Sequence, residues 1–269
     1  MKEILFTKMV GAGNDFIVVD NRLNFIKKDA AKLAIKLSDR KFSIGADGLI
    51  LLEKAGKSDV RMRILNPDGS EAEMCGNGVR CLAKFVADHR ITGSKLSIET
   101  LAGTVYAEVK GNTVKAKMVD PKDIKLNFEI QVNGHKESLS FINTGVPHAI
   151  KIVSSVSDCD VEKLGERIRR HEYFAPRGTN VDFVSVKKNN GIEVRTYERG
   201  VEAETLACGT GSTAAALVTA AVKNLKSPVM VHTKGGEVLK IYFSKTGRVF
   251  RDVYLEGRIL KSFEGKVVL

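Results

Sequence analysis

Segments in which apolar and polar residues alternate recur along most of this 269-residue chain. Alternation with a period of two is typical of β-strands that bury one face. In the first half the pattern predicts strands at 4–8, 16–20, 49–52, 60–65, 95–100, 104–109 and 113–118. Gly103 and Gly111-Asn112 separate the last three of these strands, which predicts an antiparallel meander.

The second half repeats this pattern, with strands predicted at 128–132, 139–143, 181–186 and 192–197 and a closing meander from 229. A helical period predicts helices at 29–39, with Asp29 as the expected N-cap, and at 160–170. Two further runs of helix-forming residues, 79–87 and 213–222, follow glycine-rich turns. The sequence therefore predicts an α/β protein with mixed sheets.

The chain contains an internal repeat. Arg63, the tripeptide Glu71-Ala72-Glu73 and Cys75-Gly76-Asn77-Gly78 in the first half reappear as Arg195, Glu202-Ala203-Glu204 and Cys208-Gly209-Thr210-Gly211. Gly45-Ala46-Asp47 and Gly178-Thr179-Asn180 each lie thirty residues before the cysteine of their copy. Such a repeat predicts two pseudo-symmetric domains. We expect them at 1–117, with 261–269 returning to the first domain, and at 118–260, with the active site in the cleft between them.

Each repeated cysteine, Cys75 and Cys208, precedes a predicted helix. A helix N-terminus carries unsatisfied N–H groups and partial positive charge, so it favours a thiolate and binds anions. A lone cysteine is more often a small core residue. Two copies with glycines at equivalent places favour function instead, because a glycine buries no side chain. Two sulfurs on opposite faces of one carbon would permit stereochemical inversion.

Composition narrows the class of protein further. The net charge is +11, but the lysines are scattered, Trp is absent and aromatic residues make up only 6%. Nucleic-acid-binding proteins instead cluster basic and aromatic residues, so we expect no nucleic-acid partner. The four cysteines lack metal-type spacing, and neither a signal segment nor a membrane span is predicted. We expect a cytoplasmic protein without a metal. Gly11-Ala12-Gly13-Asn14 lacks the third glycine and the following helix of a dinucleotide loop.

Several motifs together identify a family resemblance. The segments are Met9-Val10-Gly11-Ala12-Gly13-Asn14-Asp15-Phe16, Arg63-Ile64-Leu65-Asn66-Pro67-Asp68-Gly69-Ser70, Met74-Cys75-Gly76-Asn77-Gly78-Val79-Arg80-Cys81, Tyr197-Glu198-Arg199-Gly200 and Ala207-Cys208-Gly209-Thr210-Gly211. They resemble diaminopimelate epimerase over nearly the whole chain. The resemblance implies a cofactor-independent isomerase of lysine and cell-wall precursor synthesis, acting on diaminopimelate as a homodimer.

The resemblance also implies roles for particular residues. Cys75 and Cys208 would transfer the proton, and His148 and Glu198 would tune their ionisation. Substrate contacts are expected from Asn14, Asn66, Asn180, Glu198 and Arg199, and from the backbone of Gly76, Asn77, Gly209 and Thr210. Val146 stands where the family often has Asn, and Gly48 where some members have Gln. Both departures concern recognition of the distal end of the substrate.

Three alternatives remain open at this point. A proline-racemase-like enzyme also uses paired thiols, but Arg199 and the asparagines suit a longer substrate with two zwitterionic ends. A phenazine-biosynthesis-like isomerase shares the architecture without needing two cysteines. A basic nucleic-acid-binding module would show salt-dependent binding to nucleic acid.

Overall fold

The chain divides into two compact units in the computed structural model, which describes residues 3–27 and 29–268. The first unit takes the residues up to Lys117 together with those from Gly257 onward, and the second takes Met118–Glu256. Residues 1, 2, 28 and 269, which the predicted first domain includes, lie outside the described residues.

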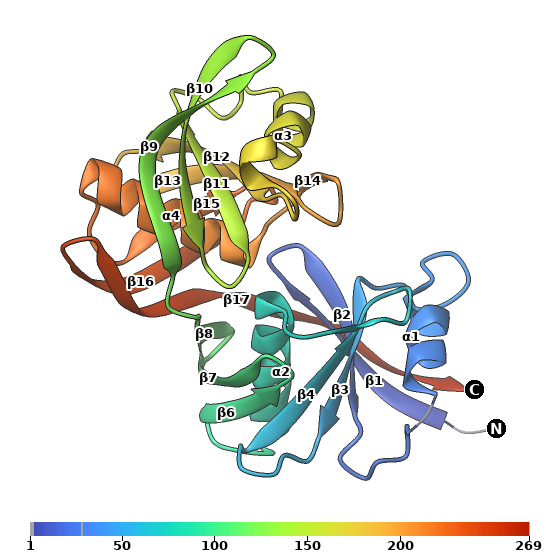
Figure 1. Ribbon diagram of the computed structural model, residues 1–269. Coiled ribbons are helices and arrows are strands. Elements are labelled where there is room, and N and C mark those ends of the chain that lie inside the picture. The colour runs from blue at the N-terminus through green and yellow to red at the C-terminus, as the bar shows by residue number, and fades with distance from the viewer. Residues whose placement is uncertain (1–2, 28, 269) are drawn as a thin grey trace. The chain divides into compact units, whose positions relative to one another are not determined.

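The first unit is a mixed sheet with two helices (Figure 1). Its elements are β1 (Glu3–Gly11), β2 (Asn14–Asp20), α1 (Ala30–Ser38), β3 (Gly48–Glu53), β4 (Val60–Leu65), β5 (Glu71–Ala72), α2 (Gly76–Asp88), β6 (Lys95–Thr100), β7 (Gly103–Lys110) and β8 (Thr113–Lys117). The pairs β2–β3 and β4–β6 are parallel, whereas β1–β2, β3–β4, β6–β7 and β7–β8 are antiparallel. The end of β17 (Val249–Val268) pairs antiparallel with β1.

Strands β2 and β3 bury both of their faces, which explains their nearly continuous apolar sequences. Val18 and Ile50 pack in one core cluster with Leu82 and other residues of α2. Alternate residues such as Ile17 point the other way and pack with α1. The period of two along each strand therefore places one helix on each face of the sheet.

The second unit repeats this arrangement. Its elements are β9 (Lys122–Val132), β10 (His135–Asn143), β11 (Pro147–Val153), α3 (Val161–Arg169), the short 3₁₀ helix η1 (Glu172–Phe174), β12 (Asn180–Lys187), β13 (Gly191–Glu198), β14 (Ala203–Thr205), α4 (Gly209–Lys223), β15 (Val229–Thr233), β16 (Val238–Thr246) and the first part of β17. Here β11–β12 and β13–β15 are parallel, in the same order as β2–β3 and β4–β6.

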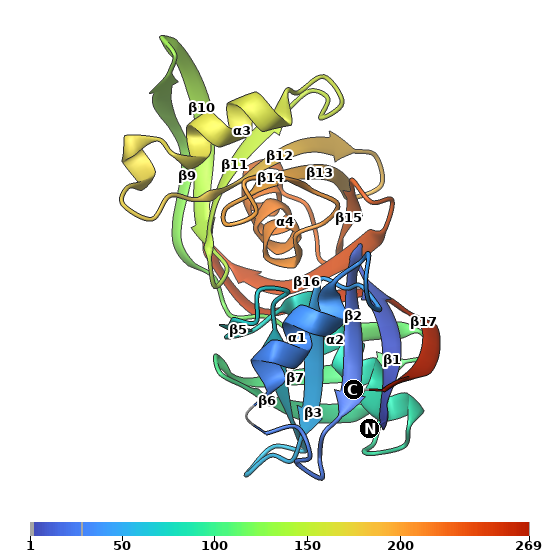
Figure 2. The ribbon, with the colours of Figure 1, turned by 90° about the vertical axis from the view of Figure 1, so that its right-hand side faces the viewer.

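Helix α4 lies at the centre of the second unit. Figure 2 shows it end-on, with the strands of its unit around it. Its residues from Gly211 to Ala220 are buried, and many of them are alanines. Small side chains let strands approach a helix closely on several sides, and alanine is also the best helix former. An alanine-rich sequence therefore suits a helix that is surrounded by sheet.

The predicted α/β class is confirmed, as are the helices and strands named above, with bounds that shift by a few residues. Strand β11 was missed, because Pro147 and His148 do not read as strand formers. Helices α2 and α4 begin directly after their cysteines, earlier than their apolar runs predicted. Asp29 occupies the N-cap of α1, but its side chain makes no capping hydrogen bond. No helix in the described part of the chain is long and apolar enough to cross a membrane.

Candidate active site

Cys75 is the N-cap of α2 in the first unit. Its backbone is extended, and its Sγ atom accepts a hydrogen bond from the amide of Gly78 at 3.5 Å. A side-chain acceptor at this position satisfies one of the amides that a helix start leaves without an intrahelical partner. The sulfur is therefore held against the positive end of the helix.

Asn77, in the first turn of α2, connects this helix end to the start of β2. Its Nδ2 donates to Asn14 Oδ1 at 2.6 Å, and Asn14 Nδ2 donates to Asp47 Oδ2 at 3.1 Å. The guanidinium of the buried Arg80 donates to Asn77 Oδ1. The structure thus brings two of the predicted contacts, Asn14 and Asn77, together in one hydrogen-bonded row of amides.

Asn66 lies in the turn after β4. Its amide donates to Ser70 Oγ at 2.9 Å, and its backbone pairs with the backbone of Ser70. No hydrogen bond joins it to Asn14 or Asn77 among the described residues. Its predicted contact with substrate stays a prediction.

A charged cluster fixes the loop behind Asn14. Asp15 accepts two hydrogen bonds from Arg40 and an ion pair from the buried Lys8 at 2.8 Å. Arg40 also bonds Asp47 at 2.7 Å. Burial raises the pKa of Asp15, but the hydrogen bonds from Arg40 and Lys8 outweigh burial and hold this pKa well below its usual value. Asp15 is therefore ionised, and the loop that carries Asp47 is tied to β1 and β2.

Cys208 occupies the equivalent place in the second unit, as the N-cap of α4. Its Sγ atom accepts from the amide of Gly211 at 3.4 Å and lies 3.4 Å from Thr210 Oγ1. Only 7% of the residue is exposed. Burial raises the pKa of this thiol well above its usual value, and the negative charges of Glu198 and Asp182 raise it further. A helix start favours a thiolate, but at Cys208 burial outweighs the helix terminus, so the thiol is favoured.

His148, on β11, lies beside the start of α4. Its Nε2 is 3.0 Å from Thr210 Oγ1, and its Nδ1 is 2.7 Å from Asp182 Oδ2. Both His148 and Asp182 are fully buried. Asp182, on β12, also accepts from Thr196 Oγ1 at 2.7 Å. The predicted tuning residue is thus part of a buried network that ends at Cys208.

The remaining predicted residues of the second unit surround this network. Asn180 donates to Pro147 O at 3.2 Å, and its Oδ1 accepts from the backbone amide of Arg199 at 2.8 Å. The Arg199 guanidinium donates to Arg177 O at 3.3 Å. Burial raises the pKa of Glu198, and the charge of Asp182 raises it further. Glu198 is close enough to affect Cys208 electrostatically.

The first two amides of each cysteine helix are available to a ligand. In the part of the chain that the structure describes, the amides of Gly76, Asn77, Gly209 and Thr210 make no hydrogen bond. Amides at a helix start form a site for an anion such as a carboxylate. Each unit thus presents a sulfur beside two such donors.

Sequence reasoning missed Asp182 and Thr196. The signal was a single acidic residue inside the apolar strand Asn180-Val181-Asp182-Phe183-Val184, where a buried charge needs partners.

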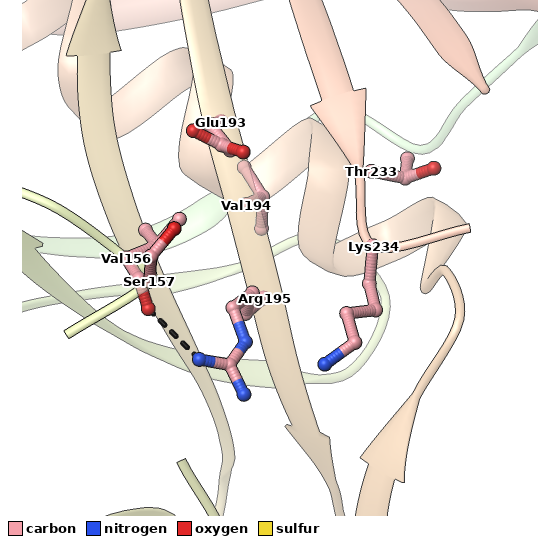
Figure 3. A pocket seen from close by; sticks show the side chains of 7 residues that line it. All are labelled: Val156, Ser157, Glu193, Val194, Arg195, Thr233 and Lys234. Atoms are coloured by element: carbon pink, nitrogen blue, oxygen red, sulfur yellow. Dashed lines mark hydrogen bonds between the residues drawn. The ribbon is translucent and has the colours of Figure 1, made fainter. Parts of the chain in front are cut away.

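A cavity of about 390 Å³ elsewhere in this unit is lined by Val156, Ser157, Glu193, Val194, Arg195, Thr233 and Lys234 (Figure 3). None of the predicted site residues lines this cavity. Its cations, Arg195 and Lys234, are both bonded to Glu204.

Comparison with known proteins places these motifs in a family. The family model described as diaminopimelate epimerase matches residues 6–123 and 140–256. A diaminopimelate epimerase of Hydrogenobaculum sp. (strain Y04AAS1) is 44% identical over 276 residues, which cover 97% of this chain and 98% of the relative. The diaminopimelate epimerase of Aquifex aeolicus (strain VF5) is 44% identical over 275 residues, with 97% of both chains covered.

Solved structures share the fold at low sequence identity. A PhzF-family phenazine biosynthesis protein of Bacillus anthracis aligns with a TM-score of 0.79 at 17% identity and covers 100% of both chains. A probable proline racemase of Agrobacterium radiobacter K84 aligns with a TM-score of 0.71 at 16% identity, over 99% of this chain and 93% of that one. These likenesses concern the fold alone, whereas the family model and the sequence relatives show that this chain belongs to the diaminopimelate epimerase family.

Proposed function

We propose that this protein is a cofactor-independent isomerase that inverts one Cα of LL-2,6-diaminopimelate to give the meso form, in lysine and peptidoglycan precursor synthesis. The observation that carries this proposal is the repeated cysteine N-cap. In each unit a sulfur accepts a hydrogen bond from the helix it caps and lies beside two amides that bond to none of the residues the structure describes. One such site could bind a carboxylate, whereas two supply the pair of acid–base groups that inversion requires.

The substrate carboxylate next to the reacting carbon binds the amides of Gly76, Asn77, Gly209 and Thr210. These donors stabilise the negative charge that spreads onto the carboxylate when the Cα proton leaves. The second amino-acid group binds the polar side chains of Asn14, Asn66, Asn180, Glu198 and Arg199. Binding both ends fixes the reacting carbon relative to the sulfurs.

One sulfur removes the Cα proton as a thiolate, and the other delivers its own proton to the opposite face of the same carbon. The raised pKa of Cys208 suits the resting thiol, so Cys208 is the donor and Cys75 the base. One proton leaves the substrate and another enters it, so its total charge does not change. His148 and Glu198 tune the two ionisation states.

The decisive experiment is epimerisation in D₂O. With LL-diaminopimelate as substrate, meso product should carry deuterium at Cα from the first turnover, while residual substrate stays largely protiated. Two different groups then exchange the proton. Equal early deuterium in substrate and product would indicate a single base, and activity on proline alone would favour a proline-racemase-like enzyme.

Single-cysteine variants test the assignment of the two groups. Cys75→Ala and Cys208→Ala should each lower epimerisation by at least about 10³-fold, the scale expected when a proton-transfer group is lost. Cys159→Ala is the matched control in the second unit and should keep nearly full activity, as should Cys81→Ala in the first. A Cys75→Ala enzyme that still inverts its substrate would rule out the two-thiol mechanism.

We also propose that the protein acts as a homodimer in the cytoplasm, without a nucleic-acid or membrane partner. The family resemblance supports the dimer, and the positive charge could help to attract an acidic substrate. Light scattering should give about twice the chain mass of 29.4 kDa. A single-chain mass at all concentrations would contradict the dimer.

A further inference from the structure

The buried network in the second unit is a set of polar groups with matched hydrogen bonds. Asp182 accepts from Thr196 through Oδ1 at 2.7 Å and contacts His148 through Oδ2 at 2.7 Å. His148 continues to Thr210 at 3.0 Å, and Thr210 to Cys208 at 3.4 Å. A buried carboxylate is unfavourable unless it is satisfied in this way. The network therefore connects the sulfur to a buried acid–base pair.

The first unit shows that packing does not require polar groups at these positions. Strand pairing places Ile50 opposite Ile64 in the first unit and Asp182 opposite Thr196 in the second. Likewise, Phe16 lies opposite Gly48, as His148 lies opposite Asn180. Thus Phe16, Ile50 and Ile64 occupy the places of His148, Asp182 and Thr196.

The glycines of the two helix starts support this equivalence. A Cβ atom at Gly78 would meet Ile64 and Ile50, at 3.0 and 3.3 Å, whereas one at Gly211 would meet Asp182. The same space beneath the helix start is filled by hydrocarbon in one unit and by a carboxylate in the other. Because hydrocarbon is sufficient for packing, the polar set of the second unit indicates a chemical role.

Neighbouring groups determine the direction of the hydrogen bonds. Asn180 Oδ1 accepts from the Arg199 amide, so its Nδ2 faces His148 Nε2, 3.5 Å away. A donor at this place makes Nε2 the acceptor nitrogen of His148 and leaves Nδ1 to donate to Asp182. Thr210 then donates to Nε2, and its oxygen can accept the S–H of Cys208.

We propose that Asp182 is a positioning residue that fixes the Nδ1–H form of His148, and that Thr210 relays the proton of Cys208 to His148, so that Cys208 becomes the thiolate base that the reverse reaction, from meso to LL, requires. In this step the Cys208 proton moves to Thr210 Oγ1 while the Thr210 proton moves to His148 Nε2. The products are a thiolate and an imidazolium paired with the Asp182 carboxylate, and the reverse step restores the thiol. The role in turnover rests on the proposed epimerase function.

The first unit carries an amide side chain at the place of Thr210. Asn77, the counterpart of Thr210, is bonded to the amide of Asn14 and to Arg80. Amide side chains do not take up and release protons near neutral pH. The proposed exchange through a hydroxyl therefore concerns Cys208, a largely buried thiol that needs an internal path.

Charged groups around Cys208 also affect its ionisation directly. His148, Asp182 and Glu198 face the start of α4 from β11, β12 and β13. From β16, Lys245 bonds Ala220 O near the other end of the helix. An experiment that measures the ionisation of Cys208 must therefore distinguish an effect of the hydrogen-bonded path from the direct effect of these charges.

The principal test measures alkylation of Cys208 by iodoacetamide against pH, with mass spectrometry of the Cys208 peptide. In Asp182→Asn, Thr196 still donates to Oδ1, so the new amide nitrogen faces His148 Nδ1 and forces the Nε2–H form. Thr210 then turns its proton toward the sulfur and favours the thiolate. Alkylation should become about tenfold faster at a given pH, a shift of about one pH unit.

A double-mutant cycle with Thr210→Val isolates the path. The shift caused by Asp182→Asn should fall to less than half in the Thr210→Val background, and Thr210→Ser should preserve it. An equal shift in both backgrounds would overturn the proposal and leave only a charge effect, as would no shift in folded Asp182→Asn. If the variants do not fold, ¹⁵N NMR of the native protein decides: His148 should carry its proton on Nδ1, and an Nε2–H form would refute the proposal.

The same variants test the role in turnover. With meso-diaminopimelate as substrate, Asp182→Asn should lower kcat by about 10²-fold or more with little change in KM, because the Nε2–H form of His148 cannot accept the proton of Cys208. An unchanged kcat would refute the role in turnover. The alkylation assay needs no substrate, so a native protein that fails to epimerise diaminopimelate would refute the proposed function while the path to Cys208 is still tested.

Discussion

At the scale of single residues, Cys208 is subject to two opposing effects. Burial and the charges of Glu198 and Asp182 raise its pKa, whereas the N–H of Gly211 lowers it. Burial is the largest of these contributions, so the thiol is favoured over the thiolate. Glu198 follows the same principle, since burial also raises its pKa. The second unit therefore holds two acidic groups toward their protonated forms.

Glu198 provides a pH-dependent prediction. A raised folded-state pKa means that the folded protein binds this proton more tightly than the unfolded chain does. The resulting stabilisation is present below the unfolded pKa, near 4.3, and is lost as the pH rises through the folded pKa. Glu198→Gln, which cannot ionise, should therefore gain stability relative to the native protein between pH 5 and pH 8.

Thermal unfolding midpoints across this pH range measure the effect. Glu193→Gln is the matched control, because Glu193 lies on the same strand and makes a partly exposed ion pair with Lys187 at 3.0 Å. The difference in unfolding midpoint between Glu193→Gln and the native protein should stay nearly constant over this pH range. If the unfolding midpoint of the native protein rises relative to that of Glu198→Gln as the pH rises, the raised pKa is contradicted.

At the scale of elements, the two cysteine helices differ in what lies beneath their starts. The third helical residue is glycine in both, Gly78 in α2 and Gly211 in α4. A methyl group at Gly78 would press on the ends of two isoleucine side chains, which can shift. A methyl group at Gly211 would meet the Asp182 carboxylate, which Thr196 and His148 hold in place. We therefore expect a methyl group to be tolerated better at Gly78 than at the equivalent Gly211.

The paired substitutions Gly78→Ala and Gly211→Ala test this difference. Alanine favours a helix over glycine by about 1 kcal/mol, which offsets part of the strain at Gly78. Displacing Asp182 leaves buried groups without partners. Gly211→Ala should therefore lower the free energy of unfolding by about 2 kcal/mol more than Gly78→Ala does. Urea unfolding midpoints give the comparison. Equal losses for the two variants would show that the carboxylate moves freely.

At the scale of the whole molecule, the proposed mechanism needs sulfurs from both units to act on one carbon. Each unit alone presents one cysteine that caps a helix, together with the first amides of that helix. Neither half can remove and replace a proton on opposite faces by itself. In the proposed mechanism, inversion therefore requires the complete chain rather than either repeat.

Oxidation tests this requirement without substrate. Two sulfurs that act on one carbon should approach each other closely enough for disulfide formation, with Cβ atoms about 4 Å apart. Mild oxidant should abolish epimerisation, and dithiothreitol should restore it. Mass spectrometry should identify a Cys75–Cys208 link in the inactive form. Retained activity in protein that carries this link would disprove the assignment of both cysteines.

The sequence by itself determined most elements and the duplication. Strand and helix periods are local, so alternation predicted β6, β7 and β8 closely, and the helical period predicted α1 and α3. The repeated Cys-Gly-x-Gly located both cysteine helices. A local pattern reports which side of an element is buried, because the backbone fixes the side-chain period.

Only the tertiary structure decided which residues face each other. The repeat suggested that Glu71-Ala72-Glu73 corresponds to Glu202-Ala203-Glu204, but strand pairing places Glu71 opposite Leu65 and Glu204 opposite Tyr197. Glu71 and Glu204 are therefore equivalent. Each is the carboxylate bound by the repeated arginine of its unit, at 2.9 Å in the first and 2.6 Å in the second.

The network at Cys208 depended on the tertiary structure in the same way. His148, Asp182, Thr196 and Thr210 are far apart in the sequence, and strand register and burial bring them together. The raised pKa of Cys208 likewise comes from burial within the whole unit, although the residue type and the helix start suggested the opposite. Ionisation depends on the dielectric and the charges around a group, which folding sets and local sequence does not.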